Sequence, residues 1–304
     1  MTAGAAADPG ARGAAPAPRV FVVGAGLMGA GVAAQCALAG FPVTLEDISD
    51  ALVERGMARA RRALDHALER GEIDPPRRDA ALGRLARAVG LDGARSADVV
   101  VEAAPEDLPL KRRLFVDLER VAAPGAILAS NTSSLPIASI AGDLRDPGRV
   151  VGLHFFNPVL QMPLVELIAS ARTREEVVER AARFATGLGK TVVRSADTPG
   201  FVTSRALAVL VNEAARMLEE RVAEPADIDT AYRLGFHHPM GPFALVDLVG
   251  IDTTVAILDI LYEGLHDERY RASPLLRRMV AQGKLGRKTG QGFYAYPARG
   301  ASPP

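Results

Sequence analysis

The sequence predicts two consecutive units, an α/β domain on a mostly parallel sheet and then an all-helical domain. In the first two thirds of the chain, short β-branched runs alternate with helical stretches, and these runs lie at residues 20–23, 43–45, 99–101, 127–128, 150–156, 164–168 and 191–193. Strands that alternate with helices are typical of a parallel sheet covered on both faces. After the turn-rich stretch Asp197-Thr198-Pro199-Gly200, the apolar spacing becomes helical.

Two parts of this pattern predict further detail. The runs from Val150 onward lie too close together for a helical crossover in every gap, so some antiparallel pairing is expected there. Beyond Gly200 we expect four helices. They lie over residues 201–218, from near Pro225, over residues 242–262, and from Pro274, with Ser273 as its cap, to near Gly283.

The bulk composition limits the class of protein. The 304 residues, 48% of them hydrophobic, are enough for one large or two ordinary domains. Lysine plus arginine equals aspartate plus glutamate, 36 against 36, so no net field favours nucleic acid or an anionic membrane, and neither is expected as a partner. No apolar run reaches the roughly 18–20 residues that cross a bilayer.

The single cysteine and the first residues bear on location. Cys36 alone excludes an internal disulfide and a cysteine-based metal site, so no metal is expected, and it suits a reducing, cytoplasmic compartment. The first 18 residues are almost entirely Ala, Gly and Pro and lack the apolar core of a signal peptide. The expected organisation is a disordered tail at 1–18, an α/β domain at 19–196 and a helical domain at 197–304.

A glycine motif follows the first predicted strand. The chain runs from that strand into Gly24-Ala25-Gly26-Leu27-Met28-Gly29 and then into a helix of small residues. In a Rossmann-type fold, Gly24 permits the tight turn, Gly26 lets a pyrophosphate approach the backbone, and Gly29 lets helix and strand pack closely. The helix N-terminus would then face the phosphates. The alternative is a glycine-rich turn that binds nothing.

An acidic pair ends the second predicted strand. Glu46 and Asp47 follow the run 43–45, and an acid at this place accepts hydrogen bonds from ribose hydroxyls and repels a 2′-phosphate. Asp47 lies nearer the strand's end, so we expect Asp47 to be the acid that binds the ribose hydroxyls. The sequence therefore predicts NAD rather than NADP as the cofactor.

Two apolar runs each contain one titratable residue. His154 lies within 150–156 and Glu166 within 164–168, and the short connection between the runs lets the two strands lie side by side. A buried carboxylate is costly unless a partner offsets its desolvation. Glu166 would then orient the His154 imidazole, whose other nitrogen serves as a general base. The alternative is a core histidine that a glutamate satisfies for structural reasons.

A polar cluster, Ser130-Asn131-Thr132-Ser133-Ser134, follows another predicted strand. The carboxyl ends of parallel strands form the ligand crevice, where hydroxyls can hold a substrate alcohol or a nicotinamide amide. Without a neighbouring site, such a cluster is an ordinary polar loop.

Together these residues resemble the L-3-hydroxyacyl-CoA dehydrogenase family, including the bacterial 3-hydroxybutyryl-CoA dehydrogenases. The resemblance covers nearly all of the chain from Val20 to Tyr296. Its most specific strings are Ala129-Ser130-Asn131-Thr132-Ser133-Ser134-Leu135, Gly152-Leu153-His154-Phe155-Phe156-Asn157-Pro158, His238-Pro239-Met240-Gly241-Pro242 and Leu285-Gly286-Arg287-Lys288-Thr289-Gly290-Gln291-Gly292-Phe293-Tyr294.

The resemblance implies roles for individual residues. His154 matches the family's catalytic base, Glu166 the acid that orients it, and Ser133 the serine between substrate hydroxyl and nicotinamide. The implied cofactor contacts are Gly24, Gly26, Leu27, Met28, Gly29, Asp47, Glu106, Lys111, Ser133, Asn157 and Lys288. The family also implies a homodimer formed through the helical domain.

One position departs from the family pattern. After Pro199-Gly200-Phe201, the family usually places a substrate-binding asparagine before the arginine, and this chain has Ser204 there. A hydroxyl can still donate to the thioester or ketone oxygen, but it is shorter and has one donor instead of two. Coenzyme A phosphates have candidate partners in Arg59, Arg61, Arg62 and Arg70, which are alternatively a solvated helix face.

These observations predict the NAD-dependent oxidation of a short-chain (3S)-3-hydroxyacyl-CoA to 3-oxoacyl-CoA, and the reverse reduction. Two alternatives keep the chemistry and change the substrate to an acyl carrier protein thioester or a free hydroxy or sugar acid. An alternative of another class is a catalytically silent NAD-binding structural protein.

Overall fold

The computed structural model describes residues 17–296 of the chain, so the tail expected at 1–18 lies almost wholly outside the described residues. One eight-stranded sheet forms the α/β domain, with the strand order β3-β2-β1-β4-β5-β6-β7-β8. Its strands are β1 (Val20–Val23), β2 (Val43–Asp47), β3 (Leu85–Val89), β4 (Val99–Glu102), β5 (Ile127–Ser130), β6 (Val150–Phe155), β7 (Leu164–Ala169) and β8 (Thr191–Ala196).

Two strands of the sheet, β7 and β8, run opposite to the other six. All neighbouring pairs run parallel apart from β6 and β7, which are antiparallel, so the expectation of antiparallel pairing beyond Val150 is confirmed. The β6–β7 register places His154 directly opposite Glu166. The short connection between these strands leaves no room for a helical crossover, which is why the chain turns back on itself.

Strand β3 was missing from the predicted set. Its sequence, Leu-Ala-Arg-Ala-Val, has a charged residue at its centre and small residues on either side, so it forms no apolar run. The strand lies at the edge of the sheet and is largely exposed. Edge strands are often short and charged because such residues discourage pairing with other chains.

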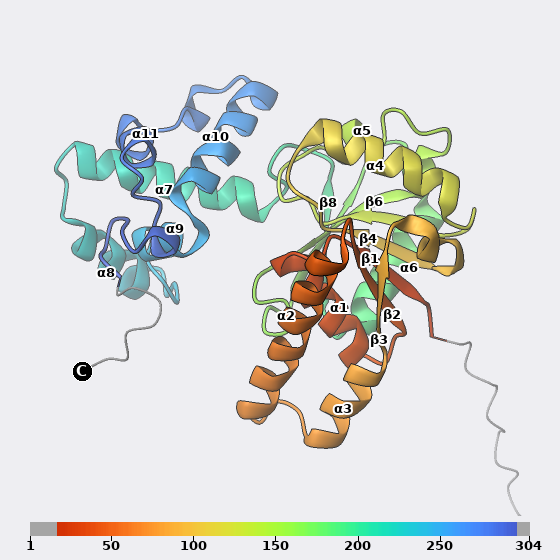
Figure 1. Cartoon of the computed structure of the whole chain (residues 1–304). Helices are drawn as coiled ribbons and strands as arrows, with labels where there is room; N and C mark the ends of the chain where they lie inside the picture. Colours follow the sequence, from red (N-terminus) through yellow and green to blue (C-terminus); the bar gives the residue numbers. More distant parts are fainter. Residues whose placement is uncertain (1–16, 297–304) are drawn as a thin grey trace, which may run out of the picture.

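Helices cover both faces of the sheet (Figure 1). Their bounds are α1 (Leu27–Leu38), α2 (Asp50–Glu69), α3 (Pro75–Gly83), α4 (Leu108–Val121), α5 (Ile137–Ile140) and α6 (Glu175–Gly187). Successive residues of β1 supply the two cores, because alternate side chains of a strand point to opposite faces. Val22 packs with α1, α2 and α6, whereas Phe21 packs with α4 and α5.

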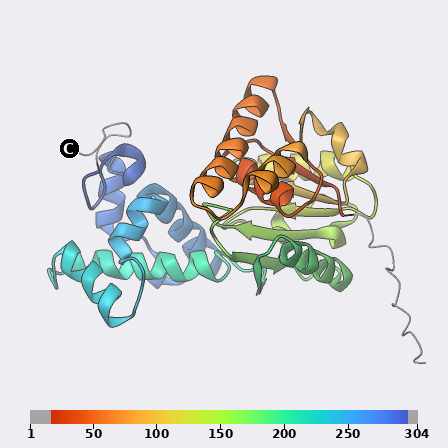
Figure 2. The same ribbon diagram turned by 90° about the horizontal axis from the view of Figure 1, so that it is seen from below.

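The helical domain contains α7 (Thr203–Glu219), α8 (Pro225–Gly235), α9 (Pro242–Val249), α10 (Ile251–Leu265) and α11 (Pro274–Ala281). Short 3₁₀ turns lie at Leu91–Ser96, Pro147–Arg149, Glu268–Tyr270 and Arg287–Thr289. Both views show α7 running from the edge of the α/β domain into the helical domain (Figure 1, Figure 2). None of the helices within residues 17–296 is long and apolar enough to span a membrane.

The prediction of a single helix over residues 242–262 was wrong. It is two helices, α9 and α10, which meet at Gly250 with a φ of 113°. No residue with a side chain adopts this backbone conformation easily, so glycine breaks the helix here. The apolar spacing continues across the break and therefore hides it. The predicted start of α11 is confirmed, since Ser273 Oγ accepts a hydrogen bond from the Leu276 N–H at 3.3 Å.

Candidate active site

The glycine motif forms a turn between β1 and α1 that fits a dinucleotide. Gly24 has a φ of 95°, and a Cβ there would lie 2.8 Å from the Ala103 carbonyl oxygen. A Cβ on Gly29 would overlap the Gly24 carbonyl, whereas nothing lies within 4 Å of the corresponding point at Gly26. Helix α1 begins at Leu27 without a side-chain cap, so its first N–H groups, including that of Met28, can bind a phosphate.

The side chain of Asp47, and not that of Glu46, contacts this turn. Its Oδ2 accepts a hydrogen bond from the Ala25 N–H at 2.8 Å, and its Oδ1 accepts one from Ile48 at 2.8 Å. Glu46 is buried and accepts a hydrogen bond from the Gly90 N–H at 3.2 Å. Because adjacent residues of β2 point to opposite faces, only Asp47 can meet a ligand on the glycine turn.

Glu46 makes stability depend on pH. Burial raises the pKa of Glu46 to about 7, and the charge of Asp47 adds to this, although the Gly90 N–H lowers it. Between the unfolded pKa and about 7, the unfolded chain releases a proton that the folded chain keeps, so stability falls as pH rises. We expect Glu46→Gln to raise the unfolding free energy at about pH 8, by ~3 kcal/mol at most, and to change it little at about pH 5.

Urea unfolding at the two pH values tests this expectation. The matched control is Glu69→Gln, because Glu69 is exposed on α2. Equal gains for Glu46→Gln at both pH values would show that the buried charge of Glu46 is not the cause.

His154 and Glu166 meet in the buried part of the sheet, as expected from the sequence. His154 Nδ1 lies 2.8 Å from Glu166 Oε2, and the Glu166 side chain is 0% exposed. The rings of Phe156 and Phe201 pack around the imidazole, with centroid distances of 4.4 and 6.2 Å. Since Nδ1 is engaged by the carboxylate, Nε2 is the nitrogen that can meet a substrate.

The other partners of Glu166 come from the start of α7. Its Oε1 accepts hydrogen bonds from the N–H groups of Val202 and Thr203 at 3.2 and 2.8 Å, and Thr203 Oγ1 donates to Oε2 at 3.0 Å. Burial raises the pKa of Glu166, but the bonds from His154 and Thr203 outweigh it and leave the pKa below its usual value. Glu166 is therefore ionised at neutral pH.

Sequence reasoning missed Thr203 and named its neighbour. Ser204 is buried in the first turn of α7. The available signal was a polar residue at the first position of a helix that lacks a side-chain cap of its own.

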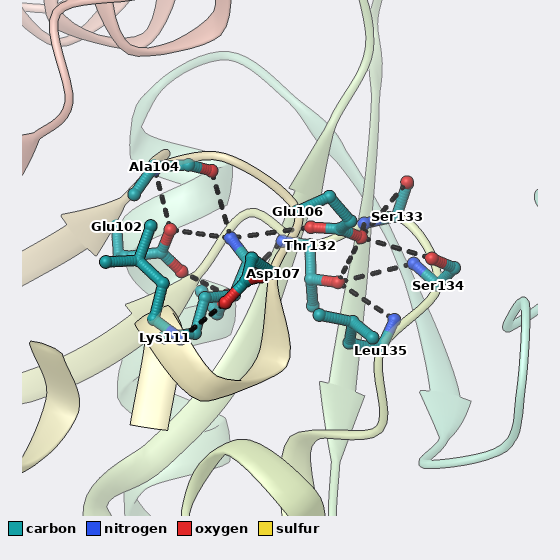
Figure 3. Close-up of polar contacts among 11 residues, drawn as sticks. Glu102, Ala104, Glu106, Asp107, Lys111, Thr132, Ser133, Ser134 and Leu135 are labelled. Carbon is teal, nitrogen blue, oxygen red and sulfur yellow. Dashed lines mark hydrogen bonds and ion pairs between the residues drawn. The ribbon is translucent and has the colours of Figure 1, made fainter. Parts of the chain in front are cut away.

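A second polar network joins the loop after β4 to the loop after β5 that carries Ser133 and Ser134, here called the serine loop (Figure 3). Glu106 Oε1 accepts hydrogen bonds from Thr132 Oγ1 at 2.6 Å, the Ser133 N–H at 3.0 Å and Ser134 Oγ at 3.1 Å. The Ser133 hydroxyl lies 3.4 Å from the same oxygen. Glu106 thus holds the loop that carries Ser133.

Lys111 lies beneath this loop between two carboxylates (Figure 3). Its Nζ donates to Glu102 Oε1 at 2.6 Å and lies 3.4 Å from Glu106 Oε2. Lys111 is 1% exposed, and Glu102 also accepts a hydrogen bond from Ser130 Oγ at 2.6 Å. Burial raises the pKa of Glu106, but the charge of Lys111 and the hydrogen bonds from the serine and threonine residues lower it by more than burial raises it. The pKa of Glu106 is therefore below its usual value.

Comparison with known proteins settles the family. A model of the 3-hydroxyacyl-CoA dehydrogenase NAD-binding domain matches residues 19–198. A model of the C-terminal domain of the same enzymes matches residues 200–296. The chain belongs to the 3-hydroxyacyl-CoA dehydrogenase family. Its cofactor is therefore NAD.

Individual relatives match along almost their whole length. The 3-hydroxybutyryl-CoA dehydrogenase of Mycobacterium tuberculosis is 45% identical over 280 residues, which are 91% of this chain and 98% of the relative. The crystal structure of M. tuberculosis FadB2 superposes with a TM-score of 0.90 at 44% identity and covers 92% of this chain and 100% of that one. The (S)-3-hydroxybutyryl-CoA dehydrogenase PaaH1 from Ralstonia eutropha has a TM-score of 0.89 at 39% identity, with 93% and 100% covered.

The remaining residues implied by the family resemblance lie in different surroundings. Asn157 follows β6 and lines a pocket of about 190 Å³ between α1, α2 and the β6–β7 loop. The same pocket is lined by Arg59, His66 and Arg70. Lys288 pairs with Asp252 of the same helical domain, with Nζ 2.7 Å from Oδ2.

The four candidate arginines of α2 are therefore not equivalent. Arg59 and Arg70 line this pocket, whereas Arg61 and Arg62 are exposed on the same helix and are not among its lining residues. Of the four, Arg59 and Arg70 therefore lie at a concave site of the kind in which small ligands bind.

Proposed function

We propose that this protein catalyses the reversible NAD-dependent oxidation of a short-chain (3S)-3-hydroxyacyl-CoA, of the 3-hydroxybutyryl-CoA type, to the 3-oxoacyl-CoA. The observation that carries the proposal is the buried His154–Glu166 pair in the same sheet as the glycine turn. Relatives that carry the name 3-hydroxybutyryl-CoA dehydrogenase support the choice of substrate.

Each side chain of the site would have a separate role in the reaction. NAD⁺, when bound, would supply the chemistry of hydride transfer from the substrate C3. His154 Nε2 takes the hydroxyl proton, while Glu166 holds Nδ1–H and stabilises the imidazolium that forms. Ser133 orients the substrate hydroxyl. In the reverse direction, His154 returns the proton to the alkoxide.

The cofactor would be held by groups around the glycine turn and the serine loop. The α1 N-terminus at Leu27 and Met28 would bind the pyrophosphate, and Asp47 the ribose hydroxyls. The further proposed contacts, from other parts of the chain, are Glu106, Lys111, Ser133, Asn157 and Lys288.

The acyl-CoA would contact two regions. Ser204 would donate to the thioester or ketone oxygen in place of the family's asparagine. Arg59 and Arg70 would meet coenzyme A phosphates, because guanidinium groups bind phosphate with paired hydrogen bonds and both line the pocket beside Asn157.

We also propose that the helical domain, residues 197–304, binds substrate and forms a homodimer in the cytoplasm. Large apolar side chains are exposed on and next to its helices, at Leu234, Phe236 and Leu248. A monomer gains nothing from leaving such groups in water, so a second copy would cover them.

A steady-state comparison tests the proposed function. We expect NADH-dependent reduction of acetoacetyl-CoA to exceed that of free acetoacetate by about 100-fold or more in kcat/KM, because free acetoacetate lacks the phosphates and each charged hydrogen bond contributes ~1.5–3 kcal/mol. NADPH should be a poor cofactor, since Asp47 repels a 2′-phosphate. Preference for the acyl carrier protein thioester or the free acid would overturn the assigned substrate, and no turnover at all would favour a silent NAD-binding protein.

A further inference from the structure

We propose that Thr203 is a positioning residue that fixes the Glu166 carboxylate against His154. This inference rests on the proposed function, because it assigns a task to Thr203 within the same proton transfer. Thr203 donates twice to Glu166, through its N–H to Oε1 at 2.8 Å and through its hydroxyl to Oε2 at 3.0 Å. The hydroxyl therefore binds the same oxygen that His154 Nδ1 contacts.

The two oxygens of Glu166 have separate sets of partners. Oε1 is held by the backbone of Val202 and Thr203, which no side-chain substitution removes. Among the residues that the structure describes, Oε2 is held by His154 and by the Thr203 hydroxyl. Without that hydroxyl, His154 would be the remaining partner of Oε2 among the described residues, and the carboxylate could rotate more easily about the Cγ–Cδ bond of Glu166. The hydroxyl thus decides how precisely Oε2 faces the imidazole.

Thr203 also ties the catalytic strand to the helical domain. It is the first residue of α7, which runs into that domain (Figure 1, Figure 2). Two residues later, Arg205 Nε donates to the Tyr270 hydroxyl at 2.9 Å, so the first turn of α7 is held from the helical side. The contact between Thr203 and Glu166 transmits the placement of this helix to the base.

The test compares Thr203→Val with Thr203→Ser. Valine keeps the shape and removes the hydroxyl, so we expect kcat to fall by roughly 3- to 10-fold, below the full effect of a lost charged hydrogen bond because the backbone donors remain. KM for acetoacetyl-CoA should stay within about twofold, since Thr203 orients the base and does not bind the substrate. Serine restores the hydroxyl and should recover most of the rate. Thr203→Ala, which removes both groups, should resemble valine.

A matched control separates positioning from general destabilisation. Thr173→Val removes a hydroxyl that donates to the Val150 carbonyl at 2.8 Å, at the end of β6 away from His154, and should leave kcat unchanged. Unaltered kcat in Thr203→Val, or an equal loss in Thr203→Ser, would overturn the proposal.

A spectroscopic readout needs no turnover. In protein with ¹⁵N-labelled histidine, the Nδ1–H signal of His154, assigned by its loss in His154→Gln, should shift or broaden in Thr203→Val and return in Thr203→Ser. An unchanged signal in Thr203→Val would contradict the positioning role of Thr203 and would leave the proposed function unaffected. Absence of acyl-CoA turnover in the wild-type protein would instead count against the proposed function, so the two failures are distinguishable.

Discussion

Replacing His154 by glutamine is expected to lower kcat by about 10²–10⁴-fold, the usual contribution of a general base. Glutamine can still donate a hydrogen bond toward Glu166, but it cannot accept and return a proton at neutral pH. KM for acetoacetyl-CoA and NADH should change little, because the loss falls on the transition state. Steady-state rates of NADH oxidation measure the effect.

His266→Gln is the matched control for this prediction. His266 directly follows α10 in the helical domain and has no contact with Glu166 among the described residues. Its variant should keep the wild-type kcat. A loss smaller than about threefold in His154→Gln would rule out His154 as the base, since it lies far below the range for proton transfer catalysis.

Replacing Lys111 by methionine is expected to destabilise the protein by about 3–5 kcal/mol, the usual cost of leaving one member of a buried ion pair alone. Methionine keeps most of the volume but removes the charge that Glu102 meets at 2.6 Å. Glu102 is fully buried and, among the residues that the structure describes, would keep the Ala104 N–H and the Ser130 hydroxyl as its donors. Urea unfolding gives the change in free energy.

The double variant Glu102→Gln/Lys111→Met is the control for a charge effect. Removing both charges should recover a large part of the lost stability, because the uncompensated carboxylate is then gone. A double variant as unstable as Lys111→Met would indicate lost packing instead. If Lys111→Met weakened NADH binding without loss of stability, the role of Lys111 as the counter-ion of Glu102 would be wrong, and only its proposed cofactor contact would remain.

Much of the fold could be read from local patterns. Seven of the strands form apolar runs that their own residues define, and the glycine turn needs only its immediate neighbours to be recognised. The same holds for Ser273, whose capping of α11 follows from a short-range hydrogen bond. Strand β3 was not predicted because its residues form no apolar run. The helix break at Gly250 was not predicted because the apolar spacing continues across it.

The candidate site divides in the same way. The sequence by itself determined that the strands of His154 and Glu166 are antiparallel neighbours, because the connection between them is too short for a helical crossover. The register that sets the two residues directly opposite each other is seen only in the structure. Only the tertiary structure decided that Thr203 completes the shell of Glu166 and that Lys111 is buried between Glu102 and Glu106. A buried charge must find donors or a counter-charge, but these can come from any part of the chain that folding brings within about 3 Å, and no local pattern records which part that is.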